Sequence, residues 1–485
     1  MKKYSFLTGL VVFASIFALS GCGQSDSKTK ASADSSNKEI FSGKIEKNKT
    51  IKVLENDTAI SKGYFKEVLA AFNEAYADKG IKAVDANTDQ FVDLAKDGPY
   101  GYGPDILYQA NDVIMKYAED KHVYPLPVSK LEAYKQTSKN AWNAFKVNKD
   151  GKDYYCGVPV NVQTPMLYYR KDLLPEDWQK TWDKDANEVP DMIENWNDMY
   201  KFSKQRHQEN PSMYGYMESL YDTYFSSGYL FSYGAYIFGK NNTDPSKVGF
   251  SNGDSYYGAK VIQQLASIMN EESIDDTIKT SAYSKLGNGT YFATMSTPDV
   301  YSTFLEELAK YYVSQGKTKD EAAQLAKDNL VMTTVPKLPK NGDITSETTE
   351  FIEMKTMGGV NGYAISAYTK APNASLEFVN FATKYEMIKK RYELLGVVPT
   401  RKDVIKEVRG VSEGVFNQLE NENIILMPSN AAVAQIWTLT QTYFADITKD
   451  VFRPEAEKKY KDNKALKAGL EKVDQQISDA IHTLE

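Results

Sequence analysis

Short strand-like segments alternate with amphipathic helix-like segments along most of this chain. Residues 50–54 form a β-type run, and residues 63–76 then carry apolar side chains at i, i+3, i+4 and i+7 from Phe65. Later segments continue the alternation, with strands expected at 291–295 and 361–366 and helices at 257–269 and 375–384. This order is typical of helices packed on mainly parallel sheets. The sequence therefore predicts an α/β fold.

One of these strands ends in polar residues. Residues 103–108 read as a turn that enters a buried strand, and Gln109, Asn111 and Asp112 follow at or just after its carboxyl end. In open α/β sheets, ligands bind at the carboxyl ends of the strands. We therefore expect Asp112 to lie near a ligand site.

The N-terminus has the pattern of an export signal. Lys2 and Lys3 precede an apolar run over 6–19, which is too short to span about 30 Å of hydrocarbon. The run ends in Leu19-Ser20-Gly21-Cys22, which resembles the lipobox of bacterial lipoproteins. The resemblance implies that residues 1–21 are a signal peptide and that Cys22 is lipidated, which would anchor the chain at the cell membrane, on its extracellular face. An ordinary signal peptide with an incidental cysteine is the alternative.

Composition limits the possibilities for the rest of the chain. Residues 22–44 are mostly small or polar and predict a flexible tether, and the 485 − 21 = 464 residues of the mature chain are enough for two lobes. Acidic residues (65) outnumber basic ones (58), which argues against nucleic acid as a partner. If Cys22 is acylated, Cys156 has no disulfide partner in the chain and reads as a buried thiol.

Aromatic residues are frequent and tyrosine dominates them: 34 Tyr, 21 Phe and 5 Trp make up 12% of the chain. A tyrosine ring has an apolar face and a polar edge, which suits a ligand with C–H faces and hydroxyl rims, such as a sugar. For any single tyrosine, packing in the core is the more ordinary interpretation.

Five segments together resemble a known family. They are Gly103-Pro104-Asp105-Ile106 with Asn111-Asp112, residues 159–175, Asp222-Thr223-Tyr224-Phe225, residues 288–295, and Met427-Pro428 followed by Trp437. Their order and spacing resemble extracellular solute-binding proteins of ABC importers, most of all the maltose/maltodextrin-binding proteins. The resemblance covers the chain from about Ile45 to its end.

The resemblance implies a two-lobed periplasmic-binding-protein fold (type II), with the ligand cleft between lobes that are joined by hinge crossings. We place lobe one at 45–162 and 336–383 and lobe two at 163–335 and 384–485. It further implies a monomer that captures maltodextrin or a related oligosaccharide by hinge closure and delivers it to the permease subunits of an ABC transporter, without a cofactor.

The resemblance also implies the sugar contacts. They are Asp112 and Gln163 from lobe one and the crossover, Asp222, Tyr224, Phe225 and Trp437 from lobe two, and in addition Asn56, Asp57 and Tyr301. Three positions depart from the family pattern: Gln163 replaces a carboxylate, Gln109 an aromatic residue and Asp299 a tryptophan. The sugar is therefore expected to be an oligosaccharide that need not be maltose.

Residues 183–194 form an acidic segment with two possible meanings. Oxygen-bearing side chains at loop positions 1, 3, 5, 9 and 12 match the spacing of an EF-hand calcium loop. Position 6, however, is Glu188 where that loop needs glycine, and Pro190 stiffens the segment. A solvated acidic insertion is the alternative.

An enzyme is the rival to a binding protein. A surface glycoside hydrolase needs two carboxylates, for which Asp112 and Asp222 are candidates. The sequence has no nucleophile elbow, zinc-protease motif or phosphate loop, and its three histidines are not at metal-ligand spacing. We therefore expect binding without catalysis and without a bound metal.

Overall fold

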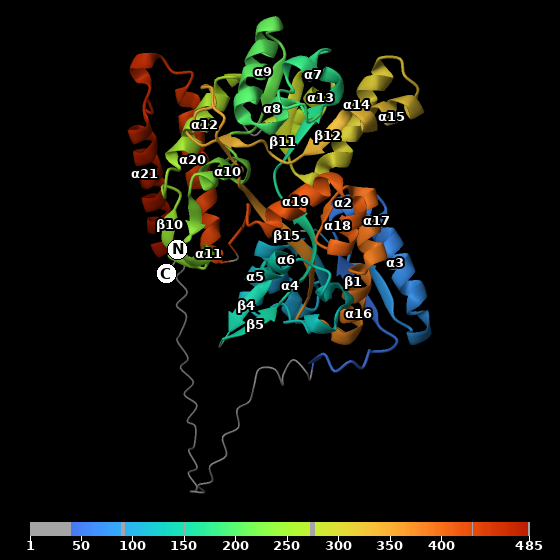
Figure 1. The fold of residues 1–485 in the computed structure, drawn as a ribbon. Coiled ribbons are helices and arrows are strands. Elements are labelled where there is room, and N and C mark those ends of the chain that lie inside the picture. Colours follow the sequence, from blue (N-terminus) through green and yellow to red (C-terminus); the bar gives the residue numbers. More distant parts are fainter. Residues whose placement is uncertain (1–39, 89–92, 150, 272–276, 429, 484–485) are drawn as a thin grey trace, which may run out of the picture.

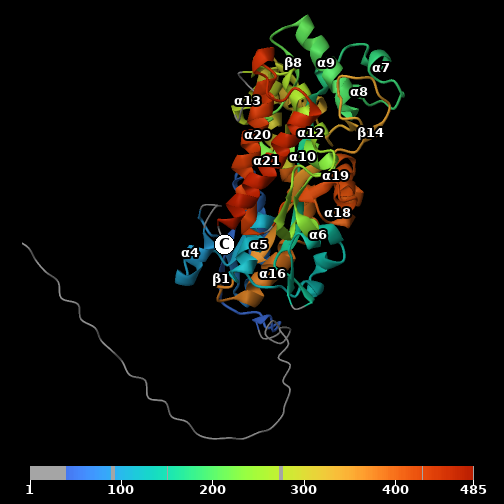
Figure 2. The same cartoon turned by 90° about the vertical axis from the view of Figure 1, so that its left-hand side faces the viewer.

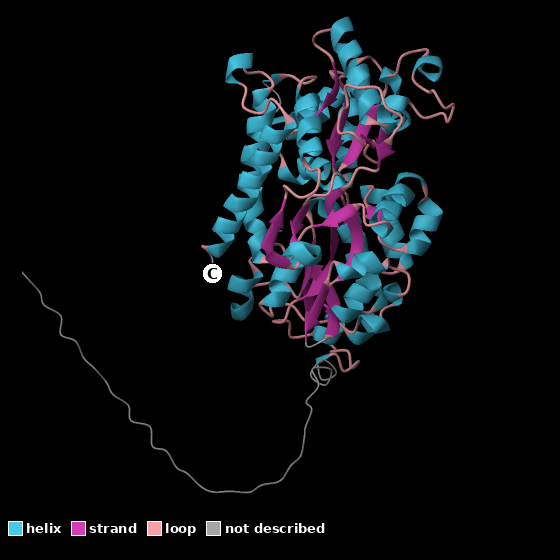
Figure 3. Cartoon of the chain, turned by 60° about the vertical axis from the view of Figure 1, so that its left-hand side comes forward, coloured by secondary structure: helices cyan, strands magenta, loops and turns pink. Residues whose placement is uncertain are grey.

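The computed structural model describes residues 40–88, 93–149, 151–271, 277–428 and 430–483. The expected signal peptide (1–21), Cys22 and most of the expected tether lie outside these residues. The described elements form two groups, one above the other in Figure 1, and each group contains its own sheet with helices around it (Figure 3). We call them lobe one, on the larger sheet, and lobe two.

Lobe one is built on a seven-stranded sheet. Its order is β16 (Val398–Pro399), β6 (Val158–Gln163), β15 (Thr356–Ile365), β3 (Ile106–Ala110), β1 (Thr50–Leu54) and β2 (Lys82–Asp85), with β17 (Ile424–Leu426) also paired to β15. Strand β1 is parallel to β2 and β3, whereas β15 is antiparallel to β3 and β6. The sheet is therefore mixed, where the sequence predicted a mainly parallel one.

Helices cover lobe one where their apolar stripes meet the sheet. The stripe predicted from Phe65 is the buried face of α3 (Tyr64–Ala75), which packs against α16 (Pro372–Ala382) and α17 (Tyr385–Leu395). The Phe72 and Phe378 rings meet edge to face at 5.1 Å. The other helices of this lobe are α2 (Asp57–Ser61), α4 (Leu94–Asp97), α5 (Asn111–Glu119), α6 (Lys139–Asn143), α18 (Lys402–Val408) and α19 (Gly410–Glu420).

Lobe two is built on a four-stranded sheet in the order β12 (Leu330–Thr333), β7 (Met166–Arg170), β11 (Tyr291–Ser296) and β8 (Tyr214–Met217). Its main helices are α9 (Trp196–Glu209), α10 (Thr223–Ser232), α12 (Tyr256–Ala266), α13 (Thr277–Gly287), α14 (Tyr301–Ser314), α15 (Lys319–Asn329), α20 (Ile436–Asp450) and α21 (Asn463–His482). Figure 2 shows α20 and α21 running side by side along one flank.

Both lobes also contain short helices and short strand pairs. They are α7 (Trp178–Thr181), α8 (Asp191–Glu194), α11 (Gly239–Asn242) and the strand pairs β4 (Lys146–Lys149) with β5 (Lys152–Tyr155), β9 (Tyr236–Phe238) with β10 (Asp244–Gly249), and β13 (Leu338–Pro339) with β14 (Phe351–Ile352). None of the described helices is both long and apolar enough to cross a membrane.

The sheet pairing does not follow the expected lobe boundaries after residue 335. Strand β13 contacts α9 of lobe two, so the chain enters the sheet of lobe one only at β15. Helix α17 packs on α3, and β16 pairs with β6, so the chain stays with lobe one well beyond residue 384. It reaches lobe two again at α20. An amphipathic stripe does not reveal which of two sheets it covers, which is why the sequence misplaced these crossings.

A buried ion pair fixes α17 to lobe one. Arg391 donates from Nη1 to Glu55 Oε2 at 2.9 Å and from Nη2 to Glu55 Oε1 at 3.0 Å, and both side chains are at most 1% exposed. The guanidinium also lies 4.0 Å from the centroid of the Tyr108 ring. Because Glu55 directly follows β1, this bidentate pair joins the helix to the carboxyl end of that strand.

The folded body begins earlier than the expected residue 45. Phe41 is 2% exposed and packs edge to face against Tyr124 at 5.8 Å. The backbone N–H of Gly43 donates to Asn373 Oδ1 at 3.0 Å. Residues 41–44, expected at the end of the tether, therefore lie against lobe one.

Candidate functional site

The strand that leaves lobe one brings Gln163 to lobe two. Gln163 ends β6 and donates from Nε2 to Asp299 Oδ1 at 2.6 Å, and Asp299 lies in the turn between β11 and α14. The second amide atom, Oε1, is buried and has no hydrogen-bond partner among the residues that the structure describes. A buried acceptor without a partner carries an unmet desolvation cost, so this oxygen is available to a ligand hydroxyl.

Asp112 lies in the first turn of α5, directly after β3, as the position after a buried strand predicted. Its Oδ1 is buried, and no described residue forms a hydrogen bond with it. Burial raises the pKa of Asp112 above its ordinary value, opposed by the backbone N–H groups of Val113 and of Asp112 itself. Its neighbour Asn111 accepts from Val360 N–H at 3.0 Å and holds the start of α5 against β15.

Asp222 caps the helix that carries two of the predicted ring residues. Its Oδ1 accepts from the backbone N–H groups of Tyr224 at 2.7 Å and Phe225 at 3.3 Å, and its carboxylate forms an ion pair with Lys279. This N-cap fixes the start of α10. The Tyr224 and Phe225 rings lie perpendicular, with centroids 5.5 Å apart.

Carboxylates of both lobes act electrostatically on Tyr224. Its hydroxyl is buried and has no hydrogen-bond partner in the described part of the chain. Burial first, and then the charges of Asp299, Asp222 and Asp112, raise the pKa of Tyr224 above its ordinary value. The charges of Asp112 in lobe one and of Asp299 and Asp222 in lobe two thus act on the same hydroxyl.

Trp437 is held next to the same helix start. The Thr223 hydroxyl donates to the backbone oxygen of Trp437 at 3.1 Å and bonds the Thr440 hydroxyl at 2.6 Å. These bonds place the first turn of α20 against the first turn of α10. Trp437 remains partly exposed, as a ring that stacks on a ligand must be.

Asn56, Asp57 and Tyr301 are the remaining predicted sugar contacts, and they lie at the starts of α2 and α14. Asn56 caps α2 through an N–H···O bond from Ala59 at 2.8 Å, and Asp57 is exposed in the first turn of that helix. Tyr301 starts α14 and lies against Gly396 of lobe one, where an added Cβ would come within 3.4 Å of the ring. Lys62, just after α2, forms an ion pair with Glu306 of α14. These contacts line the boundary between the lobes.

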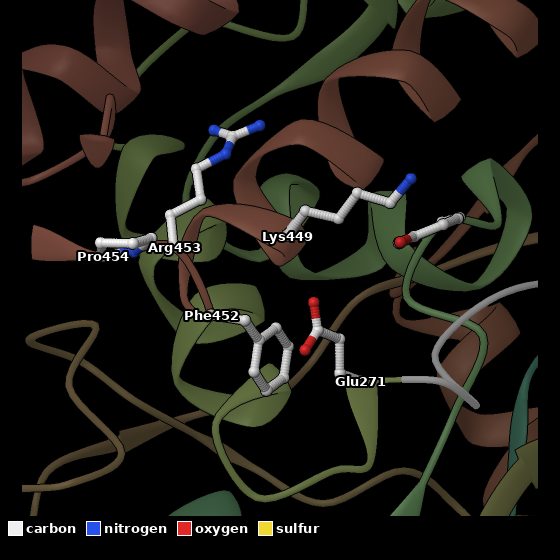
Figure 4. Close-up of a pocket in the computed structure, with 6 residues that line it drawn as sticks. Glu271, Lys449, Phe452, Arg453 and Pro454 are labelled. Atoms are coloured by element: carbon white, nitrogen blue, oxygen red, sulfur yellow. The ribbon is translucent and has the colours of Figure 1, made fainter.

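A cavity of about 170 Å³ adjoins the group on the side of lobe two. Phe225 is part of both, and Glu218, Lys279 and Tyr283 also line the cavity. A larger cavity of about 430 Å³ lies elsewhere in lobe two, between Tyr221, Glu271, Phe452 and the end of α20 (Figure 4). It contains none of the predicted site residues.

Three further residues contact the candidate site and were not predicted as sugar contacts from the sequence: Asp299, Lys279 and Glu218. Asp299 appeared only as a departure from the family pattern, although its position directly after a strand and Pro298 is the same kind of signal that identified Asp112. Lys279 and Glu218 carry no such signal. They join the site because α13 packs beside β11 and because β8 ends next to Glu218.

The acidic segment 183–194 is occupied by its own hydrogen bonds. Asp183 accepts from the backbone N–H groups of Asn187 at 3.0 Å and Glu188 at 3.2 Å, and the Asn187 amide donates to Glu194 at 2.9 Å. Within the described part of the chain, no three His, Cys, Asp or Glu side chains are grouped as metal ligands. These contacts favour the solvated insertion over calcium.

Comparisons with known proteins show the family to which the chain belongs. Residues 67–413 match the family model of the bacterial extracellular solute-binding proteins. The chain is 24% identical to the maltodextrin-binding protein MdxE of Bacillus subtilis over 90% of this chain and 91% of that one. It is 28% identical to a galactooligosaccharide-binding protein of the same organism, over 76% of this chain and 77% of that one.

Solved structures show the same fold. The maltose complex of the maltose-binding protein MalE of Listeria monocytogenes superposes with a TM-score of 0.65 at 20% identity, over 90% of this chain and 98% of that one. The maltopentaose complex of MalX from Streptococcus pneumoniae gives 0.65 at 18% identity, over 89% and 99%. The chain thus has the two-lobed fold of these proteins, and it belongs to the family of bacterial extracellular solute-binding proteins.

Proposed function

We propose that this chain is the sugar-binding lipoprotein of an ABC importer, which captures a malto-oligosaccharide or a related oligosaccharide between its lobes and delivers it to the permease. The observation that carries the proposal is a set of buried polar atoms from both lobes. Within the described residues, Asp112 Oδ1, Gln163 Oε1 and the Tyr224 hydroxyl are buried without hydrogen-bond partners. Sugar hydroxyls are suitable partners for each of them.

The rings supply the other half of sugar recognition. Trp437, Tyr224 and Phe225 belong to the first turns of α20 and α10, next to Asp222. An aromatic face covers the C–H face of a pyranose, while the carboxylates accept its hydroxyl protons. Polar and stacking groups on neighbouring helix starts therefore suit a ligand with alternating apolar faces and hydroxyl rims.

Capture follows from the division of these groups between the lobes. A sugar that bonds Asp112 of lobe one and stacks on Trp437 of lobe two completes both contacts only when the lobes are close. Such a ligand shifts the population toward the closed form. The Gln163–Asp299 hydrogen bond and the Lys62–Glu306 ion pair also join the two lobes.

The hydrolase alternative is less well supported. Asp222 is engaged as the N-cap of α10 and in the ion pair with Lys279, so its carboxylate already has partners within lobe two. The family and the relatives are binding proteins. We therefore propose that the chain binds its sugar without cleaving it.

The proposed cellular setting comes from the first residues. Lipidation at Cys22 would hold the monomeric body at the outer face of the cell membrane, through a short tether that ends near residue 40. A related solute-binding protein of Streptococcus pneumoniae, 25% identical to this chain, is named as a lipoprotein of a maltooligosaccharide ABC transporter. The net charge of −7 gives no reason to expect nucleic acid.

A thermal-shift screen of the mature chain tests this function. Maltose, maltotriose, longer maltodextrins and galacto-oligosaccharides are compared with a dipeptide and spermidine. A ligand that binds only the folded protein raises the melting temperature, so at least one oligosaccharide series raises it. A shift with the dipeptide or spermidine but with no sugar would overturn the proposal. New reducing ends after incubation would revive the hydrolase.

A further inference from the structure

The cavity beside Phe225 has the composition of a sugar subsite. Its volume of about 170 Å³ is room for roughly six water molecules at ~30 Å³ each, or for about one sugar ring. Phe225 and Tyr283 give it aromatic walls, and Glu218, Ser219, Lys279 and Ser296 give it polar groups. All six belong to lobe two.

Glu218 is the buried charge of this cavity. The residue is 1% exposed, and its Oε2 accepts from the hydroxyls of Tyr216 at 2.7 Å and Tyr229 at 2.9 Å. Its Oε1 is buried and, within the described ranges of the chain, has no hydrogen-bond partner. Neither tyrosine lines the cavity, so Oε1 is the carboxylate oxygen left to a group within it.

An unpartnered carboxylate oxygen calls for an explanation. A buried polar atom without a partner costs on the order of 1–3 kcal/mol, and folded proteins contain few of them. The two tyrosines would be equally well held by a glutamine oxygen, so their bonds do not require a carboxylate. A ligand hydroxyl that donates to Oε1 would satisfy the atom.

We propose that this cavity is a subsite of lobe two that receives one sugar unit of the oligosaccharide, with Glu218 Oε1 accepting a hydrogen bond from a hydroxyl of that unit. The proposal rests on the proposed function. Phe225 connects the subsite to the residues around Tyr224, so the ligand continues from the cleft into the cavity. Glu218 then selects ligands by the donor that they present there.

Titration of wild-type protein and of Glu218→Gln with maltotriose and a galacto-oligosaccharide tests the subsite. The new amide can still accept from the tyrosines but turns its NH₂ group toward the cavity, so we expect about a tenfold loss of affinity for the sugar that wild type binds. Glu271→Gln, in the larger cavity, is the matched control and leaves the affinity unchanged. Equal affinities of Glu218→Gln and wild type would overturn the subsite.

The pH dependence of binding separates a ligand contact from a structural role. Burial raises the pKa of Glu218 to about 7. The charge of Asp222 adds to this rise, and the hydroxyls of Tyr216 and Tyr229 oppose it. Lys279 and Tyr283 of α13 also line the cavity. An ionised carboxylate is the better acceptor, so wild-type affinity falls as the pH is lowered through about 7. This fall is absent in Glu218→Gln, and identical pH profiles would contradict the proposal.

Filling the cavity provides a second test. Ala282 of α13 lines it, and Ala282→Leu reduces its volume without touching Glu218. We expect this variant to lose affinity for the longer sugar and to keep the melting temperature of the unliganded protein within a few degrees. If wild type binds no sugar at all, the proposed function and the subsite fail together. If both variants bind as wild type does, only the subsite fails.

Discussion

Asp112 directly follows a buried strand, and its role at the ligand site stays a prediction. Its Oδ1 is buried and has no hydrogen-bond partner among the described residues. Burial disfavours the ionised form of this carboxyl. Its presence is therefore better explained by a ligand than by stability.

Asp112→Asn tests that explanation. Hydrogen bonds to charged groups contribute about 1.5–3 kcal/mol, so we expect a loss of affinity for the bound oligosaccharide of about 10- to 100-fold. The free energy of unfolding of the unliganded protein should stay equal or rise slightly, because a buried charge is removed. Calorimetric titration and urea unfolding measure the two effects, with the exposed Asp120→Asn as the control. Lower stability at unchanged affinity would show that Asp112 is structural.

Glu218 leads to a prediction about stability and pH. Burial raises its pKa from 4.5 to about 7 in the folded protein, so between these values the folded protein holds a proton that the unfolded chain has released. The free energy of unfolding therefore falls as the pH rises from about 4 to about 7. Relative to wild type, Glu218→Gln should gain about 3 kcal/mol over this window, since one pKa unit is about 1.4 kcal/mol. A constant difference between the two proteins would contradict this.

Other site residues were beyond what the sequence could indicate. The strand-end pattern and the family resemblance predicted Asp112, Asp222, Tyr224, Phe225 and Trp437 as sugar contacts, which stays a prediction. They did not identify Glu218 or Lys279, because those residues reach the site only through the packing of α10, α13 and β11. Asn56 looked like a ligand residue in sequence, but its side chain caps α2.

At the scale of elements, the attachment of α17 shows where sequence patterns fall short. Its apolar stripe predicts a helix correctly but fits either lobe, and the chain was expected to leave lobe one at residue 384. The Glu55–Arg391 pair decides the matter, since it joins α17 to the end of β1 over more than 300 residues of sequence. Polar pairs so distant in sequence leave no local signal.

Two substitutions on α17 compare a buried ion pair with an exposed one. Arg391→Met leaves Glu55 buried and uncompensated, which costs about 3–5 kcal/mol of unfolding free energy. Lys390→Met removes the exposed pair with Glu67, 2.7 Å long, and costs about 0–1 kcal/mol. Urea unfolding of both variants measures the difference. Equal losses would mean that the buried pair does not fix α17 to lobe one.

At the scale of the whole molecule, the two-lobed α/β fold was predictable and its chain crossings were only partly so. Alternating strands and helices, together with the family resemblance, predicted two sheets, and the chain passes from β6 of one sheet to β7 of the other after Gln163. The return crossings were misplaced because β13, β14 and β16 are only two residues long and make no pattern in the sequence. The proposed function depends on the first crossing, which brings Gln163 to Asp299.

Hydrogen–deuterium exchange of the mature chain, with and without saturating oligosaccharide from the thermal-shift screen, tests the central claim most directly. If the sugar binds between the lobes, amides at the start of α5 in lobe one and at the starts of α10 and α20 in lobe two become protected together. Protection confined to one lobe, or none at all at saturation, would contradict capture between the lobes.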